Sequence, residues 1–222
     1  MMGLRLVLWL MVAQLAMTFP ADASHLPIEV SFATADGGEV YADLYGQGVH
    51  GVVLAHGAAF DKESWRPLAE RLSAHGEQVL AIDFRGYGKS RAGSKPDGLD
   101  EDVLAAVRYL HGRGEKSVAV IGASMGGGAA ARAATEARPG EINRLILLSP
   151  VPIDDPEQLH AGSVLFIASR DEGLAAAVQA QYRRAPGPKQ LLLLDGSAHA
   201  QHIFRTAQAG RLTAAILRFL GR

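Results

Sequence analysis

Apolar runs of strand length alternate with helix-length segments along most of the chain, and this order limits the fold more than any other feature. A hairpin pattern comes first, in which residues 28–33 and 39–45 flank the turn Asp36-Gly37-Gly38. The strand-like runs that follow are residues 52–55, 78–83, 117–121, 144–148, 164–168 and 190–194. The helical patterns between them are residues 64–75, 100–111, 125–137, 174–185 and a last one within 200–220. Continuous apolar runs suit strands buried on both faces, so we expect an α/β fold with a mostly parallel twisted sheet and helices on both faces.

The N-terminal segment has the three-part pattern of a secretory signal peptide. Arg5 gives a basic start, residues 6–16 are almost wholly apolar, and Ala21-Asp22-Ala23 is a small-x-small cleavage site. An uncleaved membrane anchor is the alternative, but the apolar stretch is shorter than the roughly 20 residues that a spanning helix needs. We therefore expect residues 1–23 to be a signal peptide, no stable membrane span after its removal, and an exported protein, periplasmic or secreted.

Composition sets limits on partners and chemistry. The chain has 222 residues, which suits one domain, here expected over residues 24–222. The formal net charge is -1 and gives no reason to expect nucleic acid as a partner, since phosphate binding needs a clustered positive face. The absence of cysteine excludes disulfides and thiolate chemistry. No H-E-x-x-H or other metal-ligand spacing occurs, so we expect neither metal nor cofactor.

The strongest functional signal is Gly122-Ala123-Ser124-Met125-Gly126. It directly follows the predicted strand 117–121 and precedes an alanine-rich helix, which is the context of a nucleophile elbow. Glycines on both sides allow close backbone approach, and the helix N-terminus points free N–H groups at developing negative charge. A plain strand–turn–helix with glycines used for packing is the alternative. The context favours Ser124 as a nucleophile.

A histidine and an acid that could serve this serine follow in the sequence. His199 lies on the loop after the last predicted strand, where it can reach a serine at the same sheet edge and act as its base. His202, three residues on, is expected in the next helix and outside the site. Asp171 and Glu172, after the run 164–168, are both candidates for the acid that orients the histidine. We prefer Asp171 slightly, because Asp is the commoner residue in this role, and keep Glu172 open.

The order Ser124, acid, His199 matches the α/β-hydrolases and neither chymotrypsin nor subtilisin, and the chain resembles that superfamily over its whole mature length. The resemblance places His56-Gly57-Ala58-Ala59-Phe60 at the oxyanion loop and implies the backbone N–H groups of Ala58 and Met125 as the oxyanion hole, with Ala59 as the fallback. Asp83 to Ser90 resembles the family's structural D-x-R-G-x-G-x-S turn.

The segment 150–163 is too short for a lid or cap, so we expect a compact, capless enzyme similar in outline to serine esterases and dienelactone hydrolases. The expected function is hydrolysis of an ester-like bond of a small molecule through an acyl-enzyme. A peptidase, thioesterase or perhydrolase on the same residues stays open. A binding protein that kept the fold without turnover is the alternative from another class.

Overall fold

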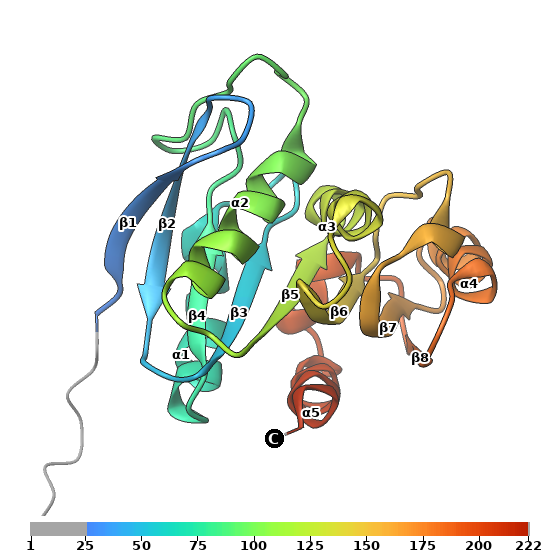
Figure 1. Ribbon diagram of the computed structural model, residues 1–222. Helices are drawn as coiled ribbons and strands as arrows, with labels where there is room; N and C mark the ends of the chain where they lie inside the picture. The colour runs from blue at the N-terminus through green and yellow to red at the C-terminus, as the bar shows by residue number, and fades with distance from the viewer. Residues whose placement is uncertain (1–25, 222) are drawn as a thin grey trace, which may run out of the picture.

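The computed structural model describes residues 26–221, and the expected signal peptide 1–23 lies outside this range. An eight-stranded sheet forms the centre of the molecule, with strands in the order β1-β2-β4-β3-β5-β6-β7-β8 (Figure 1). The strands are β1 (Ile28–Ala33), β2 (Glu39–Tyr45), β3 (His50–Ala55), β4 (Gln78–Ile82), β5 (Ser117–Ala123), β6 (Ile142–Leu148), β7 (Ala161–Ser169) and β8 (Lys189–Leu194). β1 pairs antiparallel with β2, and β2 pairs antiparallel with β4, while every other pair is parallel. The predicted α/β architecture is confirmed.

Helices cover the sheet on both faces. The helices are α1 (Arg66–Ala74), α2 (Leu99–Gly112), α3 (Met125–Glu136), α4 (Ala175–Arg184) and α5 (Ala209–Leu220). α2, α3 and α4 pack on one face, and α1 and α5 on the other. Strand β3 shows why both faces are apolar: Val53 and Ala55 belong to the first core, while Val52 and Leu54 belong to the second. This alternation follows from the two-residue period of a strand, and burial on both faces explains the unbroken apolar runs.

On the face of the sheet that carries α1 and α5, which we call the second face, each helix is preceded by a short 3-10 helix. The sequence pattern predicts one continuous helix in each of these two segments. Residues Lys62–Trp65 form η1, capped by the Asp61 carboxylate that accepts from the Ser64 amide at 2.9 Å, and α1 follows with a proline in its first turn. Residues Ala200–Arg205 form η3, and extended backbone at Thr206 separates it from α5. β6 and β7 are joined by residues 149–160, which contain one short 3-10 helix, η2 (Pro156–Gln158).

The turn after β4 ties the hairpin to the rest of the sheet. The Ser90 hydroxyl donates to the Asp83 carbonyl at 2.8 Å and accepts from the Tyr41 amide at 2.9 Å. Gly88 has a φ of 51°, and a Cβ there would lie 2.2 Å from the Asp83 carboxylate, so a side chain would strain the backbone and displace this carboxylate. The structural role expected for this turn is therefore supported by its contacts.

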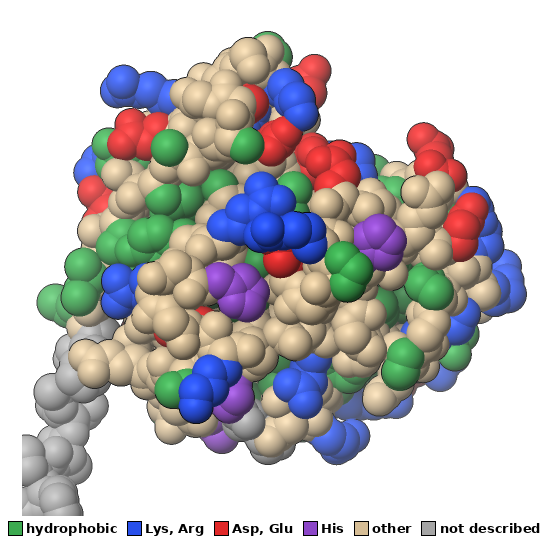
Figure 2. Space-filling view, in the orientation of Figure 1, with side chains coloured by type: hydrophobic (Ala, Val, Ile, Leu, Met, Phe, Trp, Pro, Cys, Tyr) green, Lys and Arg blue, Asp and Glu red, His purple; other side chains and the backbone are tan. Residues whose placement is uncertain are grey.

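The face that carries α2 and α3 mixes charges. Figure 2 shows lysine and arginine side chains interspersed with acidic and uncharged ones on this face. Within residues 26–221, no helix combines the length and the apolar character needed to cross a membrane.

Candidate active site

Ser124 lies at the junction of β5 and α3 in a strained backbone conformation. Its φ of 52° and ψ of -113° are sparsely populated by residues with a side chain, at a cost of about 1–3 kcal/mol. A Cβ on Gly122 would lie 2.4 Å from the Gly126 carbonyl oxygen, and one on Gly126 would lie 2.4 Å from that of Ala55. Both glycines of the motif are therefore required by close backbone packing, which holds the serine at the carboxyl edge of the sheet.

His199 reaches this serine from the loop after β8. Its Nε2 lies 2.8 Å from the Ser124 hydroxyl oxygen, and its Nδ1 lies 2.5 Å from Oε2 of Glu172. The His199 side chain is 38% exposed, whereas that of Glu172 is 1% exposed. The structure thus brings the expected serine and histidine together and adds Glu172 as the third member of a hydrogen-bonded series.

The slight preference for Asp171 as the acid was wrong. Asp171 is exposed, and its amide donates to the Gly196 carbonyl at 3.0 Å. Glu172 is buried, and its Oε1 accepts from the Ser169 amide at 2.8 Å. Glu172 lies one residue further from β7 than Asp171, and its longer side chain still reaches His199. Sequence reasoning could not decide which of the two neighbouring acids points at the histidine.

Ser149 is a contributor that the sequence did not reveal. It directly follows β6, has a positive φ of 46° and is completely buried. Its hydroxyl donates to Oε1 of Glu172 at 2.6 Å and accepts from the Ala200 amide at 3.1 Å. Ser149 therefore links the acid to the residue after His199, and no local motif marks it because its partners come from two distant loops.

The expected oxyanion loop lies against Ser124. A Cβ on Gly57 would lie 3.4 Å from Cβ of Ser124, so the loop after β3 passes directly beside the nucleophile candidate. Ala58 follows on this loop, and Met125 is the first residue of α3. The Tyr87 hydroxyl donates to the Ala58 carbonyl at 2.9 Å and lies 3.9 Å from Sδ of Met125. Tyr87 thus bridges the two segments, although the sequence indicated only a structural turn there.

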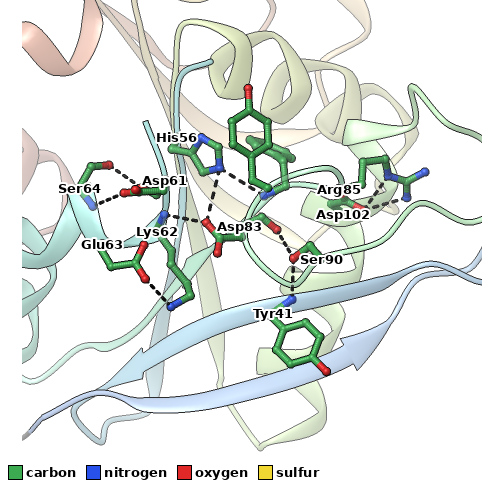
Figure 3. Close-up of polar contacts among 12 residues, drawn as sticks. Tyr41, His56, Asp61, Lys62, Glu63, Ser64, Asp83, Arg85, Ser90 and Asp102 are labelled. Atoms are coloured by element: carbon green, nitrogen blue, oxygen red, sulfur yellow. Dashed lines mark hydrogen bonds and ion pairs between the residues drawn. The ribbon is translucent and has the colours of Figure 1, made fainter. Parts of the chain in front are cut away.

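A second histidine, His56, bonds to the backbone of the expected oxyanion loop. His56 is completely buried; its Nδ1–H donates to the Gly57 carbonyl at 2.9 Å, and its Nε2 accepts from the Phe84 amide at 3.3 Å. Both bonds together fix a neutral ring, and burial lowers the pKa of His56. Figure 3 shows His56 beside Asp83, whose carboxylate accepts from the Lys62 amide at 2.9 Å.

Lys62 closes this buried network. Its ammonium donates to Asp43 at 2.8 Å and to Glu63 at 2.9 Å. Burial lowers the pKa of Lys62, but the hydrogen bonds to these carboxylates outweigh burial and hold it above its usual range. Burial also raises the pKa of Asp83. The network thus joins β2, η1 and the turn after β4 underneath the oxyanion loop.

The remaining candidates lie apart from Ser124. His202 is exposed, as expected, and its ring contacts that of Phe60 at an interplanar angle of 58°, with ring centroids 5.0 Å apart. Ligand atoms of Asp100, Glu101 and Glu136 lie within 4.8 Å of one another. Since Glu136 ends the helix that Ser124 begins, this acidic group is remote from the serine.

The geometry sets out what the site can do chemically. A carboxylate that accepts from Nδ1–H leaves Nε2 with its lone pair directed at the serine hydroxyl. His199 can then take the hydroxyl proton as the oxygen attacks an electrophile. Met125 begins α3 directly after this serine, and the loop after β3 passes beside it, so backbone N–H groups of these two segments are candidates for holding an oxyanion.

Comparison with known proteins places this geometry in context. A family model described as an alpha/beta hydrolase family matches residues 52–220. A non-heme chloroperoxidase from Streptomyces lividans is 36% identical over 104 residues, which are 46% of this chain and 37% of that protein. An N-formylmaleamate deformylase from Pseudomonas putida is 34% identical over 113 residues, which are 50% of this chain and 41% of that protein. The matches thus span less than half of these relatives' lengths.

Solved structures share the overall fold described above. The esterase Pf2001 from Pyrococcus furiosus superposes with a TM-score of 0.75 at 22% identity, covering 88% of this chain and 90% of that one. At this identity the likeness concerns the fold. Because the family model covers well over half of the sequence, the chain belongs to the alpha/beta hydrolase family.

Proposed function

We propose that the protein is a serine hydrolase that cleaves an ester-like bond of a small molecule through an acyl-enzyme. The observation that carries this proposal is the continuous series from the Ser124 hydroxyl through His199 to Glu172, with distances of 2.8 and 2.5 Å. The strained backbone of Ser124 supports the same role, since strain of this kind clusters at functional sites.

The first half of the reaction forms the acyl-enzyme. Nε2 of His199 takes the hydroxyl proton while Oγ of Ser124 attacks the carbonyl carbon. The N–H groups of Ala58 and Met125 receive the oxyanion in this mechanism. The imidazolium then returns its proton to the leaving alcohol as the bond to that oxygen breaks. Glu172 stays ionised and stabilises the imidazolium.

The second half releases the acid. Water approaches from the open side of His199, which is 38% exposed, and gives its proton to Nε2 as its oxygen attacks the acyl carbon. The tetrahedral intermediate collapses with the proton returned to Oγ of Ser124. Serine as the attacking group distinguishes this proposal from aspartate-nucleophile chemistry on the same fold.

Covalent labelling is the sharpest test. A fluorophosphonate probe should add one adduct mass to the wild-type protein and none to Ser124→Ala. Hydrolysis of 4-nitrophenyl acetate should fall by at least about 10⁴-fold in the same variant, with thermal stability nearly unchanged. Ser197→Ala, an exposed serine of the His199 loop, is the matched control and should label normally. Labelling that persists in Ser124→Ala would refute the assignment, and a wild-type protein that never labels would favour a binding protein without turnover.

A second candidate is perhydrolysis on the same residues. It is supported by similarity to proteins named non-heme chloroperoxidase and non-heme haloperoxidase, at 36% and 31% identity. Hydrogen peroxide would replace water as the attacking group, so that the acyl-enzyme yields a peracid and free serine. Bromide oxidation in the presence of acetate ester and hydrogen peroxide measures this product. A rate far below ester hydrolysis under the same conditions would leave hydrolysis as the function.

A further inference from the structure

A groove of about 450 Å³ lies between the N-terminal parts of α1 and α5, on the second face of the sheet. This volume falls within the range of small-molecule sites. Its walls come from η1 and α1 on one side and from η3 and α5 on the other. Nothing in the mechanism proposed above uses this groove.

The walls are largely apolar and aromatic. Phe60, Trp65 and Phe204 line the groove together with aliphatic side chains of both helices. Trp65 is 1% exposed and packs edge-on against Phe204, with ring centroids 6.0 Å apart. Its indole Nε1–H has no hydrogen-bond partner among residues 26–221, which leaves a donor unsatisfied in the groove wall. The groove therefore suits a ligand with an apolar body.

The charge of the groove has one sign. Among the described residues that line it, only Arg71 and Arg205 are charged, and none carries a carboxylate. Neither arginine forms an ion pair within the described part of the chain, although Arg205 lies 5.7 Å from the centre of the Phe60 ring. The first residues of α5, Ala209 and Gly210, add the positive end of a helix dipole. Two guanidinium groups without an ion-pair partner in the described chain, one of them over the Phe60 ring, are complementary to an apolar molecule that ends in a carboxylate.

Gln201 places the groove next to Ser124. Its Nε2 donates to the Ser64 hydroxyl at 2.8 Å, and both residues line the groove. Its Oε1 accepts from the Gly57 amide at 2.8 Å. A Cβ on Gly57 would lie 3.6 Å from that oxygen and 3.4 Å from Cβ of Ser124. Gln201 and Gly57 thus connect the groove to Ser124.

We propose that this groove binds the acyl part of the substrate, and that the preferred substrates are esters whose apolar acyl chain ends in a second, free carboxylate. This inference rests on the proposed function for the position of the ester bond at Ser124. The carboxylate lies against Arg71 and Arg205, and the chain passes Phe60 and Gln201 on its way from the nucleophile. The groove then sets specificity through charge and length, separately from the chemical step.

The kinetic test compares acyl groups of equal length with and without the charge. Mono-4-nitrophenyl esters of succinate, adipate and suberate are compared with the 4-nitrophenyl esters of butanoate, hexanoate and octanoate. We expect kcat/KM to favour the carboxylate of one length by at least about tenfold, mostly through KM, because uniform binding energy lowers KM. The double variant Arg71→Gln/Arg205→Gln should reduce this preference to within about threefold while the neutral esters keep their rates.

A matched control removes two arginine charges that lie outside the groove, one on α1 and one on α5. Arg66 on α1 and Arg211 on α5 are exposed and do not line the groove. The double variant Arg66→Gln/Arg211→Gln should keep the carboxylate preference. A wild-type protein without any such preference, or a control that loses it equally, would overturn the inference and leave the serine hydrolase intact.

A binding measurement separates the groove from catalysis. The chain has two tryptophans, Trp9 and Trp65, so Trp9→Phe leaves Trp65 as the only fluorophore of its kind, inside the groove wall. In a Ser124→Ala/Trp9→Phe protein, hexanoate and adipate should change tryptophan emission with saturation, and 1-hexanol should do so at least tenfold more weakly. Adding Arg71→Gln/Arg205→Gln should remove the difference. Equal affinity for hexanol and hexanoate would refute the groove even if esters are hydrolysed, and saturable binding by a protein that hydrolyses no ester would refute only the proposed function.

Discussion

Two histidines at the carboxyl edge of the sheet each have a carboxylate nearby, yet their surroundings differ. His199 lies 2.5 Å from Glu172 and is 38% exposed, with its other nitrogen 2.8 Å from the Ser124 hydroxyl. His56 lies 4.0 Å from Asp83 and is completely buried, and both of its nitrogens are engaged with backbone groups of Gly57 and Phe84. The first pair faces solvent and a hydroxyl, and the second faces only the protein interior.

This difference indicates that His199 can act as a base, whereas His56 can only hold the loop after β3 in place. A ring whose two nitrogens are occupied by backbone cannot accept a further proton without losing a hydrogen bond, and burial penalises its charged form. A ring with one nitrogen on a carboxylate and the other on a hydroxyl can accept that proton. The residue pair alone is therefore not diagnostic, because what matters is the group that the second nitrogen contacts.

The largest effect should come from replacing Glu172, the acid that contacts His199. Glu172→Gln should lower kcat about 10⁴-fold, because the amide cannot stabilise the imidazolium or hold its tautomer. Asp171→Asn is the matched control one residue away, and since this side chain is exposed it should cost less than about tenfold. Steady-state kinetics on 4-nitrophenyl acetate measures both. Similar losses in the two variants would remove Glu172 from the site.

The buried histidine should act through position. His56→Asn keeps a donor near Nδ1 for the Gly57 carbonyl, whereas His56→Gln keeps only an acceptor near Nε2 for the Phe84 amide. If the Nδ1 bond holds the oxyanion loop, His56→Gln should lose about 100-fold in kcat, because a small misplacement of the site has this cost, and His56→Asn should lose clearly less. Circular dichroism melts identify variants that fail to fold. Equal activity of both folded variants would show that the loop does not depend on this bond.

Replacing Ser149 should have a smaller effect on the pair formed by Glu172 and His199. Ser149→Ala removes the 2.6 Å donor to Glu172 and leaves the Ser169 amide in place, so the acid is held less firmly. We expect kcat to fall about tenfold with KM unchanged, which corresponds to one hydrogen bond to a charged group. Ser197→Ala in the His199 loop is the control and should behave like wild type. A change confined to KM would place Ser149 in substrate binding instead.

The smallest effect should be on how the free energy of unfolding depends on pH. Burial lowers the pKa of His56, so below about pH 6.5 the unfolded chain binds a proton at this position that the folded chain does not. The free energy of unfolding should therefore fall as the pH is lowered from 7.5 to 5.5, by at most about 1.4 kcal/mol per pH unit for this group. Urea midpoints measure the slope, and His56→Asn should flatten it. An unchanged slope in that variant would show that His56 is protonated in the folded chain.

The sequence alone determined the fold and the two members of the candidate site, Ser124 and His199, that are encoded locally. Strand-length apolar runs alternate because each strand is buried on both faces, and the elbow pattern around Ser124 follows from close packing of Gly122 and Gly126 against neighbouring backbone. His199 could be singled out because a loop after the last strand ends at the same edge. These features depend on residues within one or two consecutive elements.

Only the tertiary structure decided which acid contacts His199, because Asp171 and Glu172 are adjacent in a loop whose direction is set by contacts elsewhere. The Asp171 amide bonds to Gly196, and the Glu172 carboxylate is held by Ser169 at the end of β7 and by Ser149 from the loop after β6. In the same way, Tyr87 meets Ala58 and Met125, and Gln201 meets Gly57 and Ser64, across large distances in the sequence. Such pairings carry no local signal, since hydrogen-bond partners from separate loops are chosen by how the strands and helices pack.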